Sequence, residues 1–143
     1  MHIALATTGN DIARCFPVMA ELRTHLNAEQ FIQQVKRQQQ EGYQLAFLED
    51  AGEIRSLAGF RFMEMLAFGK LMYVDDLVTA DKDRSKKYGG KLFDWLVAHA
   101  KANGCAQLQL DSGVHRFSAH RFYLTKRMEI SSHHFALKLD STS

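Results

Sequence analysis

Residues 76–96 read DLVTADKDRSKKYGGKLFDWL, and this stretch decides how the chain is organised. An apolar, strand-like run ends near Thr79, and a polar turn follows it. Gly89-Gly90 then stand where a helical pattern of apolar side chains begins. The stretch therefore predicts a strand that leads through a short turn into a helix.

The chain beyond this turn predicts a helix and then another strand. Residues 88–103 carry apolar side chains at helical spacing, and Gly104 ends the pattern. Residues 105–112, CAQLQLDS, alternate strictly between apolar and polar side chains. Because a strand, a helix and a strand follow one another, we expect a parallel pair joined by a right-handed crossover.

The N-terminal part of the chain predicts a strand and two helices. Residues 2–8 alternate weakly and favour a strand. Asn10 or Asp11 can cap the first helix, which Pro17 should kink or delay. Asn27 can cap a second helix, whose narrow apolar stripe places it on the surface.

The remaining segments complete an α+β fold. Turn signals separate three strand-like runs that favour an antiparallel meander, at 43–50, 56–68 and 71–79. After the crossover we expect a helix at 118–126 and a final strand at 129–139. Together the elements predict a mixed sheet with helices on both faces, in one domain over residues 1–143.

The composition describes an ordinary globular chain. Of its 143 residues, 46% are hydrophobic and 24% charged, and the net charge of +2 is too small to indicate nucleic-acid binding. There is no run of about 20 apolar residues and no secretory leader, so we expect a cytoplasmic protein that does not span a membrane. Cys15 and Cys105 lie far apart and are expected to be free thiols.

The turn at 80–90 has the features of a phosphate site. A helix N-terminus presents main-chain N–H groups and a partial positive charge, and glycine lets an anion approach the backbone. Basic side chains gather at the same point: Arg84, Lys86, Lys87 and Lys91. Neither the Walker nor the dinucleotide glycine pattern is present. A basic, solvated loop is the alternative reading of the same residues.

In the details of this turn and its flanks, the sequence resembles the GCN5-related N-acetyltransferase (GNAT) superfamily. Arg84, Lys87 and Gly89 occupy the spaced positions of the family's donor motif, with lysine in place of its first glycine. Residues 73–79 look like the family's fourth strand, and residues 119–123, AHRFY, look like its fourth helix. The motif is closest to aminoalkylphosphonate acetyltransferases and to uncharacterised small-molecule acetyltransferases.

The resemblance implies a fold and a donor site. The family fold is a mixed, mostly antiparallel, twisted sheet of six to seven strands, with about four helices on both faces and a splayed central parallel pair. The donor would be acetyl-CoA, its pantetheine arm along the fourth strand and its pyrophosphate at the helix entrance. The residues expected to bind it are Leu77, Val78, Thr79, Arg84, Ser85, Lys86, Lys87, Tyr88, Gly89, Gly90, Lys91 and His120.

The resemblance also implies direct acetyl transfer to a primary amine, most simply that of a small molecule. Tyr123 corresponds to the tyrosine near the coenzyme sulfur and is the candidate general acid. Asp75 and Asp76 are candidates for the base or for orienting the amine, and water-mediated proton removal is equally open. Strand alternation predicts Asp75 on the face of Tyr73 and Leu77, and Asp76 on the face of Val74 and Val78.

Other readings stay open at this point. The same fold could serve as a non-catalytic acyl-CoA-binding regulatory module or as a protein or peptide N-acetyltransferase, and a homodimer is possible. We expect no metal, because His133 and His134 would point to opposite faces of the final strand. Arg23 and Arg61 could favour an acidic acceptor, with solvated surface as the default reading.

Overall fold

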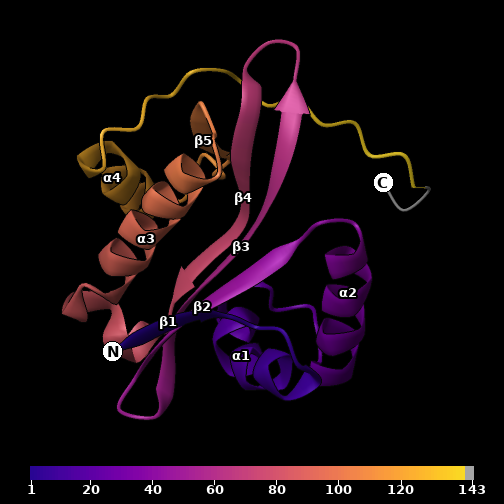
Figure 1. The fold of residues 1–143 in the computed structure, drawn as a ribbon, viewed down its shortest axis with the longest axis vertical. Coiled ribbons are helices and arrows are strands. Elements are labelled where there is room, and N and C mark those ends of the chain that lie inside the picture. Colours follow the sequence, from indigo (N-terminus) through magenta and orange to yellow (C-terminus); the bar gives the residue numbers. More distant parts are fainter. Residues whose placement is uncertain (141–143) are drawn as a thin grey trace. The chain divides into compact units, whose positions relative to one another are not determined.

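The protein's structure, a computed structural model, describes residues 1–140 (Figure 1). The chain divides into two compact units, one over Met1–Leu110 and one from Asp111 onward. The first unit contains β1 (His2–Leu5), α1 (Gly9–Leu22), α2 (Ala28–Gln40), β2 (Gln44–Asp50), β3 (Glu53–Met65), β4 (Gly69–Thr79), the 3-10 helix η1 (Asp81–Lys86), α3 (Tyr88–Ala102) and β5 (Gln107–Leu110). The second contains α4 (Phe117–Thr125). Within the described residues, no helix is long and apolar enough to cross a membrane.

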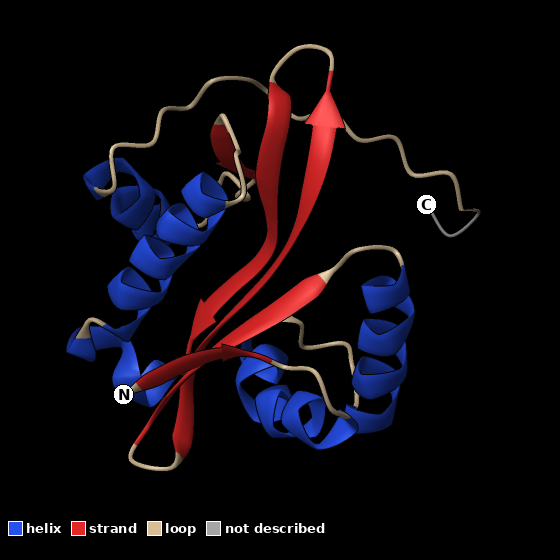
Figure 2. Cartoon of the chain, viewed as in Figure 1, coloured by secondary structure: helices blue, strands red, loops and turns tan. Residues whose placement is uncertain are grey.

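The sheet confirms the predicted meander and crossover. Its strands lie in the order β1-β2-β3-β4-β5, with antiparallel pairs from β1 to β4 and a parallel β4–β5 pair (Figure 2). The helix between β4 and β5 is α3, which begins and ends within a residue of the predicted bounds. The α+β class and the mixed, mostly antiparallel sheet are therefore confirmed.

The sheet has five strands rather than the six to seven expected, because residues 129–139 form no strand in the described chain. Phe135, Leu137 and Leu139 do alternate, but their side chains are 92%, 84% and 89% exposed. An alternating pattern becomes a strand only with a hydrogen-bonded neighbour, and this segment has none among residues 1–140. The prediction that His133 and His134 lie in a strand was therefore wrong. His134 Nδ1 lies 3.4 Å from Asp111 Oδ1.

The predicted N-cap is confirmed for α2 and wrong for α1. Asn27 caps α2 as predicted, and its side chain and that of Gln30 bond each other's main chain in a capping box. The cap of α1 is Thr8, whose hydroxyl accepts from the Asp11 amide at 3.1 Å, so the prediction of Asn10 or Asp11 was wrong. The helix starts early and continues through Pro17.

Two apolar layers hold the sheet between its helices (Figure 1). On one face α1 and α2 pack against alternate side chains of β2 and β3, among them Leu45, Phe47 and Leu57. On the other face α3 packs against Ala46, Phe60 and their neighbours. The period of two along the strands divides these residues between the two layers.

A bulge in β4 reverses this alternation at the predicted site. Gly59 pairs with Asp76 and Phe60 with Val74, so Asp75 is an extra residue without a counterpart on β3. Val74 consequently lies in the α3 layer and Val78 in the α1–α2 layer. The prediction that Asp76 shares a face with both valines was wrong, because a single inserted residue shifts every later side chain to the opposite face.

Gly59 leaves the space in which Tyr43 and Asp76 form a hydrogen bond. A Cβ atom built at Gly59 would overlap the Tyr43 hydroxyl and lie 2.7 Å from Asp76 Oδ2. Tyr43, which precedes β2, uses this gap to donate a hydrogen bond to Asp76 Oδ2 at 2.8 Å. The absence of a side chain at one position on β3 thus permits a contact between two others.

We predict that Gly59→Ala lowers the free energy of unfolding by about 2 kcal/mol, because the methyl group must displace a buried ring and its hydrogen bond. Urea denaturation measures the effect. Gly9→Ala is the matched control, because a Cβ there meets only Lys36 Nζ at 3.4 Å, and it should keep or slightly raise stability. Equal stability of the two variants would contradict the close packing at Gly59.

A second prediction concerns Cys15, whose thiol is fully buried on α1. Burial raises its pKa to about 12 from an ordinary value of 9.0. The unfolded chain therefore loses this proton first, and the contribution of Cys15 to stability declines between pH 9 and pH 12. The stability gap between the wild type and Cys15→Ala should narrow by about 1.4 kcal/mol per pH unit above pH 9. A constant gap would show that the thiol is accessible to solvent.

Candidate functional site

The edge of β4 that faces β5 is open over its second half. The short strand β5 pairs only with residues Leu71–Val74 of β4. Beyond the bulge, from Asp75 to Thr79, no strand of residues 1–140 pairs with β4 on that side (Figure 2). Main-chain hydrogen-bonding groups on such an edge are available to an extended ligand.

The N-terminus of α3 lies at the end of this edge. Lys87 stands at the N-cap with left-handed backbone angles, φ 67° and ψ 13°, and no side-chain capping bond is found there in the described structure. A Cβ built at Gly89 would lie 2.8 Å from Thr79 Oγ1, which shows how closely the first turn of α3 approaches β4. The structure thus brings Leu77–Thr79 and the turn at 84–91 together.

Buried ionic contacts fix the turn that leads into α3. The carboxylate of Asp83 is completely buried and lies 3.2 Å from Arg55 Nη1 and 3.4 Å from Lys86 Nζ. The Tyr88 hydroxyl donates to Asp50 Oδ2 at 2.7 Å, and this bond lowers the pKa of Asp50 and raises that of Tyr88. The entrance of α3 is therefore tied to β2 and β3 and does not behave as a loose loop.

The basic side chains of this turn differ in their partners. Arg84 pairs with Asp81 at 2.7 Å and Lys86 with Asp83, so acidic neighbours offset part of their charge. Lys87 and Lys91 are exposed and have no acidic partner in the described part of the chain. These two lysines provide the uncompensated positive charge at the N-terminus of α3.

The two acids of β4 are each held by an arginine. Asp75 accepts two hydrogen bonds from Arg61, at 3.1 and 2.7 Å. Asp76 accepts from Arg23 Nε at 2.9 Å, and Arg23 Nη2 donates to the Asp75 carbonyl at 3.0 Å. The reading of Arg23 and Arg61 as solvated surface was wrong, because the partners of a long side chain depend on tertiary contacts that sequence spacing does not reveal.

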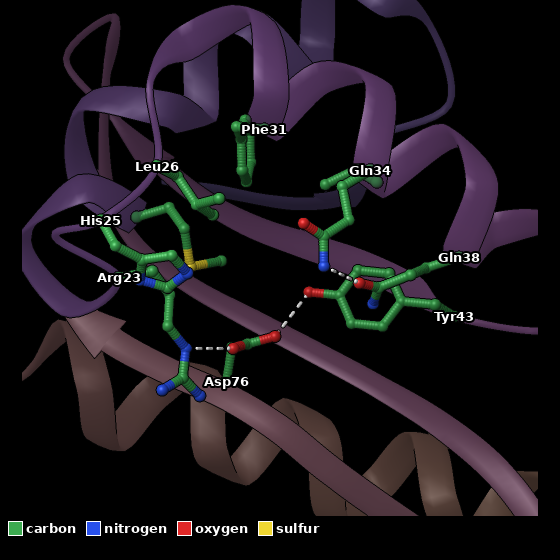
Figure 3. Close-up of a pocket in the computed structure, with 10 residues that line it drawn as sticks. Arg23, His25, Leu26, Phe31, Gln34, Gln38, Tyr43 and Asp76 are labelled. Atoms are coloured by element: carbon green, nitrogen blue, oxygen red, sulfur yellow. Dashed lines mark hydrogen bonds and ion pairs between the residues drawn. The ribbon is translucent and has the colours of Figure 1, made fainter. Parts of the chain in front are cut away.

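Asp76 lies at the base of a cavity of about 250 Å³ between β4 and the two N-terminal helices (Figure 3). The lining residues are Met19, Arg23, His25, Leu26, Phe31, Gln34, Val35, Gln38, Tyr43 and Asp76. Burial, reinforced by the adjacent carboxylate, raises the pKa of Tyr43 well above its ordinary value. Tyr43 is therefore a neutral phenol that donates to Asp76. No sequence motif marked this cavity.

The C-terminal unit contains the other predicted site residues, on α4. Tyr123 is half-buried, and burial raises the pKa of its phenol although Arg116 acts in the opposite direction. His120 Nε2 lies 2.8 Å from the carbonyl oxygen of Gly113. At neutral pH Tyr123 is thus protonated and can donate a proton, as its assigned role requires.

Comparison with known proteins decides the family. The family model described as "Acetyltransferase (GNAT) family" matches residues 6–128. The chain belongs to this family. Its sequence is 35% identical over 127 residues to YhdJ of Bacillus subtilis (strain 168), an uncharacterised N-acetyltransferase, covering 88% of this chain and 89% of the relative.

Solved GNAT structures share the fold of this domain. A ribosomal-protein-alanine N-acetyltransferase from Brucella melitensis biovar Abortus 2308 aligns with a TM-score of 0.83 at 15% identity, over 97% of this chain and 100% of the other. A glucosamine-6-phosphate N-acetyltransferase from Arabidopsis thaliana aligns with a TM-score of 0.74 at 20% identity, over 98% and 100%. The predicted family, fold and acyltransferase class are confirmed.

The left-handed Lys87 generates a test of the donor turn in this GNAT domain. We predict that Lys87→Gly changes the free energy of unfolding by less than about 0.5 kcal/mol, because relief of strain offsets the added freedom of glycine. Lys87→Val should cost about 2 kcal/mol, since a branched side chain fits these angles poorly. Lys91→Val removes the same charge within the helix and serves as control. Equal losses for both valine variants would rule out the assigned backbone conformation.

Proposed function

We propose that this GNAT domain transfers an acetyl group from acetyl-CoA to the primary amine of a small molecule, directly and within a ternary complex. The observation that carries the proposal is the open edge of β4, which ends at the N-terminus of α3. An extended arm that ends in a diphosphate matches an unpaired strand edge followed by a helix N-terminus.

The donor would lie along both features. The main chains of Leu77, Val78 and Thr79 would bond the pantetheine arm, and amides of the first turn of α3 would bind the pyrophosphate. Lys87 and Lys91 would add charge at the same point, and the exposed Arg84 and Ser85 precede them in the turn. Gly89 contributes by letting the helix approach Thr79.

The chemistry is acyl transfer through a tetrahedral intermediate. The nitrogen lone pair attacks the thioester carbonyl, the new C–N bond forms, and the C–S bond then breaks. In this proposal the departing thiolate takes a proton from the Tyr123 hydroxyl, and the amide nitrogen gives its surplus proton to water or to a carboxylate. The reaction needs no oxidant, reductant or covalent acyl-enzyme.

The ion pairs favour different roles for Asp75 and Asp76. Both oxygens of Asp75 are engaged by Arg61, and this favours holding the bulge over accepting a proton. Asp76 faces the cavity, and each of its oxygens receives one hydrogen bond from the protein. An oxygen of a carboxylate can accept more than one hydrogen bond, so Asp76 is the better candidate to orient the amine.

We predict that Tyr123→Phe lowers kcat by about 100-fold and changes the KM for acetyl-CoA less than about threefold, because only proton donation is lost. Thiol release from acetyl-CoA, measured against a panel of short alkylamines, diamines, amino acids and amino sugars, provides the assay. Ser118→Ala removes an exposed hydroxyl from the same helix and should leave both constants unchanged.

Three outcomes would overturn all or part of the proposal. Failure to bind acetyl-CoA in calorimetry would remove the donor assignment. Binding without thiol release on any amine of the panel would identify a regulatory module that senses acyl-CoA. Release only with peptide amines would replace the small-molecule acceptor with a protein.

A further inference from the structure

The cavity on the α1–α2 side of β4 has a balanced pair of charges at its base. Asp76 and Arg23 lie 2.9 Å apart, and their side chains are 14% and 43% exposed. The other polar groups of the lining are the neutral Tyr43 phenol, two glutamine amides and the imidazole of His25. A cavity whose charged groups cancel favours a ligand whose own charges cancel, since an excess charge would have no partner there.

The two charged groups can each bind one more partner. Arg23 uses Nε on Asp76 and Nη2 on the Asp75 carbonyl, and no hydrogen bond of Nη1 is found within residues 1–140. Each oxygen of Asp76 accepts one hydrogen bond, from Arg23 or from Tyr43. A ligand with a donor and an anion separated by one carbon atom could therefore bind both groups at once.

Four apolar side chains form one wall of the cavity, beside the polar groups already named. Met19 comes from α1 and Val35 from α2. Leu26, between the two helices, and Phe31, on α2, complete this wall (Figure 3). The volume of about 250 Å³ suits a single compact molecule rather than a folded partner. The wall would receive an alkyl or aryl side chain.

The cavity lies next to the proposed donor edge. Asp76 directly follows the bulge and precedes Leu77–Thr79 on the same strand. At roughly 3.3 Å per residue, Asp76 is within about 10 Å of the whole donor segment. An amine held by Asp76 is thus close to the part of β4 that would hold the pantetheine arm.

We propose that this cavity binds the acceptor, and that the acceptor is a free α-amino acid with an apolar side chain. Its ammonium group bonds Asp76 and gives one proton to water or to that carboxylate before the nitrogen attacks. Its carboxylate bonds Arg23, and its side chain packs against Met19, Leu26 and Phe31. This inference rests on the proposed acetyl transfer and specifies its substrate class.

The first experiment compares matched acceptors on the wild-type protein. L-leucine and L-phenylalanine are paired with isopentylamine and phenethylamine, which lack only the carboxylate. We expect kcat/KM for each amino acid to exceed that of its amine by about tenfold or more, as a charged hydrogen bond provides. Equal or higher values for the plain amines would overturn the inference and leave the proposed transferase intact. Absence of thiol release with every acceptor would overturn the transferase itself.

The second experiment uses Arg23→Gln. The variant should lower kcat/KM for L-leucine by at least about tenfold and that for isopentylamine by less than about threefold. Arg14→Gln is the matched control on α1, the helix that Arg23 directly follows, because Arg14 pairs with Glu49 at 2.6 Å and does not line the cavity. Thermal unfolding of both variants separates lost folding from lost recognition.

Arg23→Lys keeps the charge and tests its role alone. It should restore part of the preference for L-leucine over isopentylamine, since a lysine can meet a carboxylate with one hydrogen bond. Arg23 only supports Asp76 if Arg23→Gln lowers kcat/KM equally for L-leucine and isopentylamine and Arg23→Lys restores neither value. The carboxylate assignment is then wrong.

Discussion

The extra residue in β4 is the constraint on which the rest of this structure depends. With Asp75 outside the β3–β4 register, Asp76 turns toward α1 and α2, and Leu77 turns toward α3. Tyr43 and Arg23 then reach Asp76 from β2's start and from the end of α1. An unbulged strand would point Asp76 into the α3 layer, where a carboxylate would lie among apolar side chains at high cost.

The same strand changes its neighbours at this point. Up to Val74 it is paired on both edges, and after Asp75 only the β3 side stays paired within the described chain. The bulge therefore coincides with the beginning of the open edge. The proposed donor segment, the acids and the cavity all meet within a few residues of β4. Contacts of the buried Asp83 and the half-buried Tyr88 hold the adjoining helix entrance.

Local patterns were sufficient for much of the fold. Apolar spacing located α3, turn residues located β2 to β4, and Asn27 indicated the start of α2. The bulge was not predictable, because Asp75 and Asp76 are adjacent acids in an otherwise apolar run and nothing in the sequence marks one of them as an inserted residue. The apolar alternation of Phe135, Leu137 and Leu139 was present, but pairing depends on a neighbour that sequence does not specify. The site divides in the same way: the donor turn carries a motif, whereas the cavity arises from residues scattered between Met19 and Asp76.

Lys87 stands where the donor motif that the sequence resembles has its first glycine, and its backbone is left-handed. The position has a left-handed backbone, which glycine adopts freely and which costs lysine about 1 kcal/mol of conformational free energy. Lysine, asparagine or aspartate can therefore occupy it wherever neighbouring packing is firm enough to absorb that strain. Searches for distant members that demand glycine here would discard genuine relatives, whereas a search scored on main-chain angles would retain them.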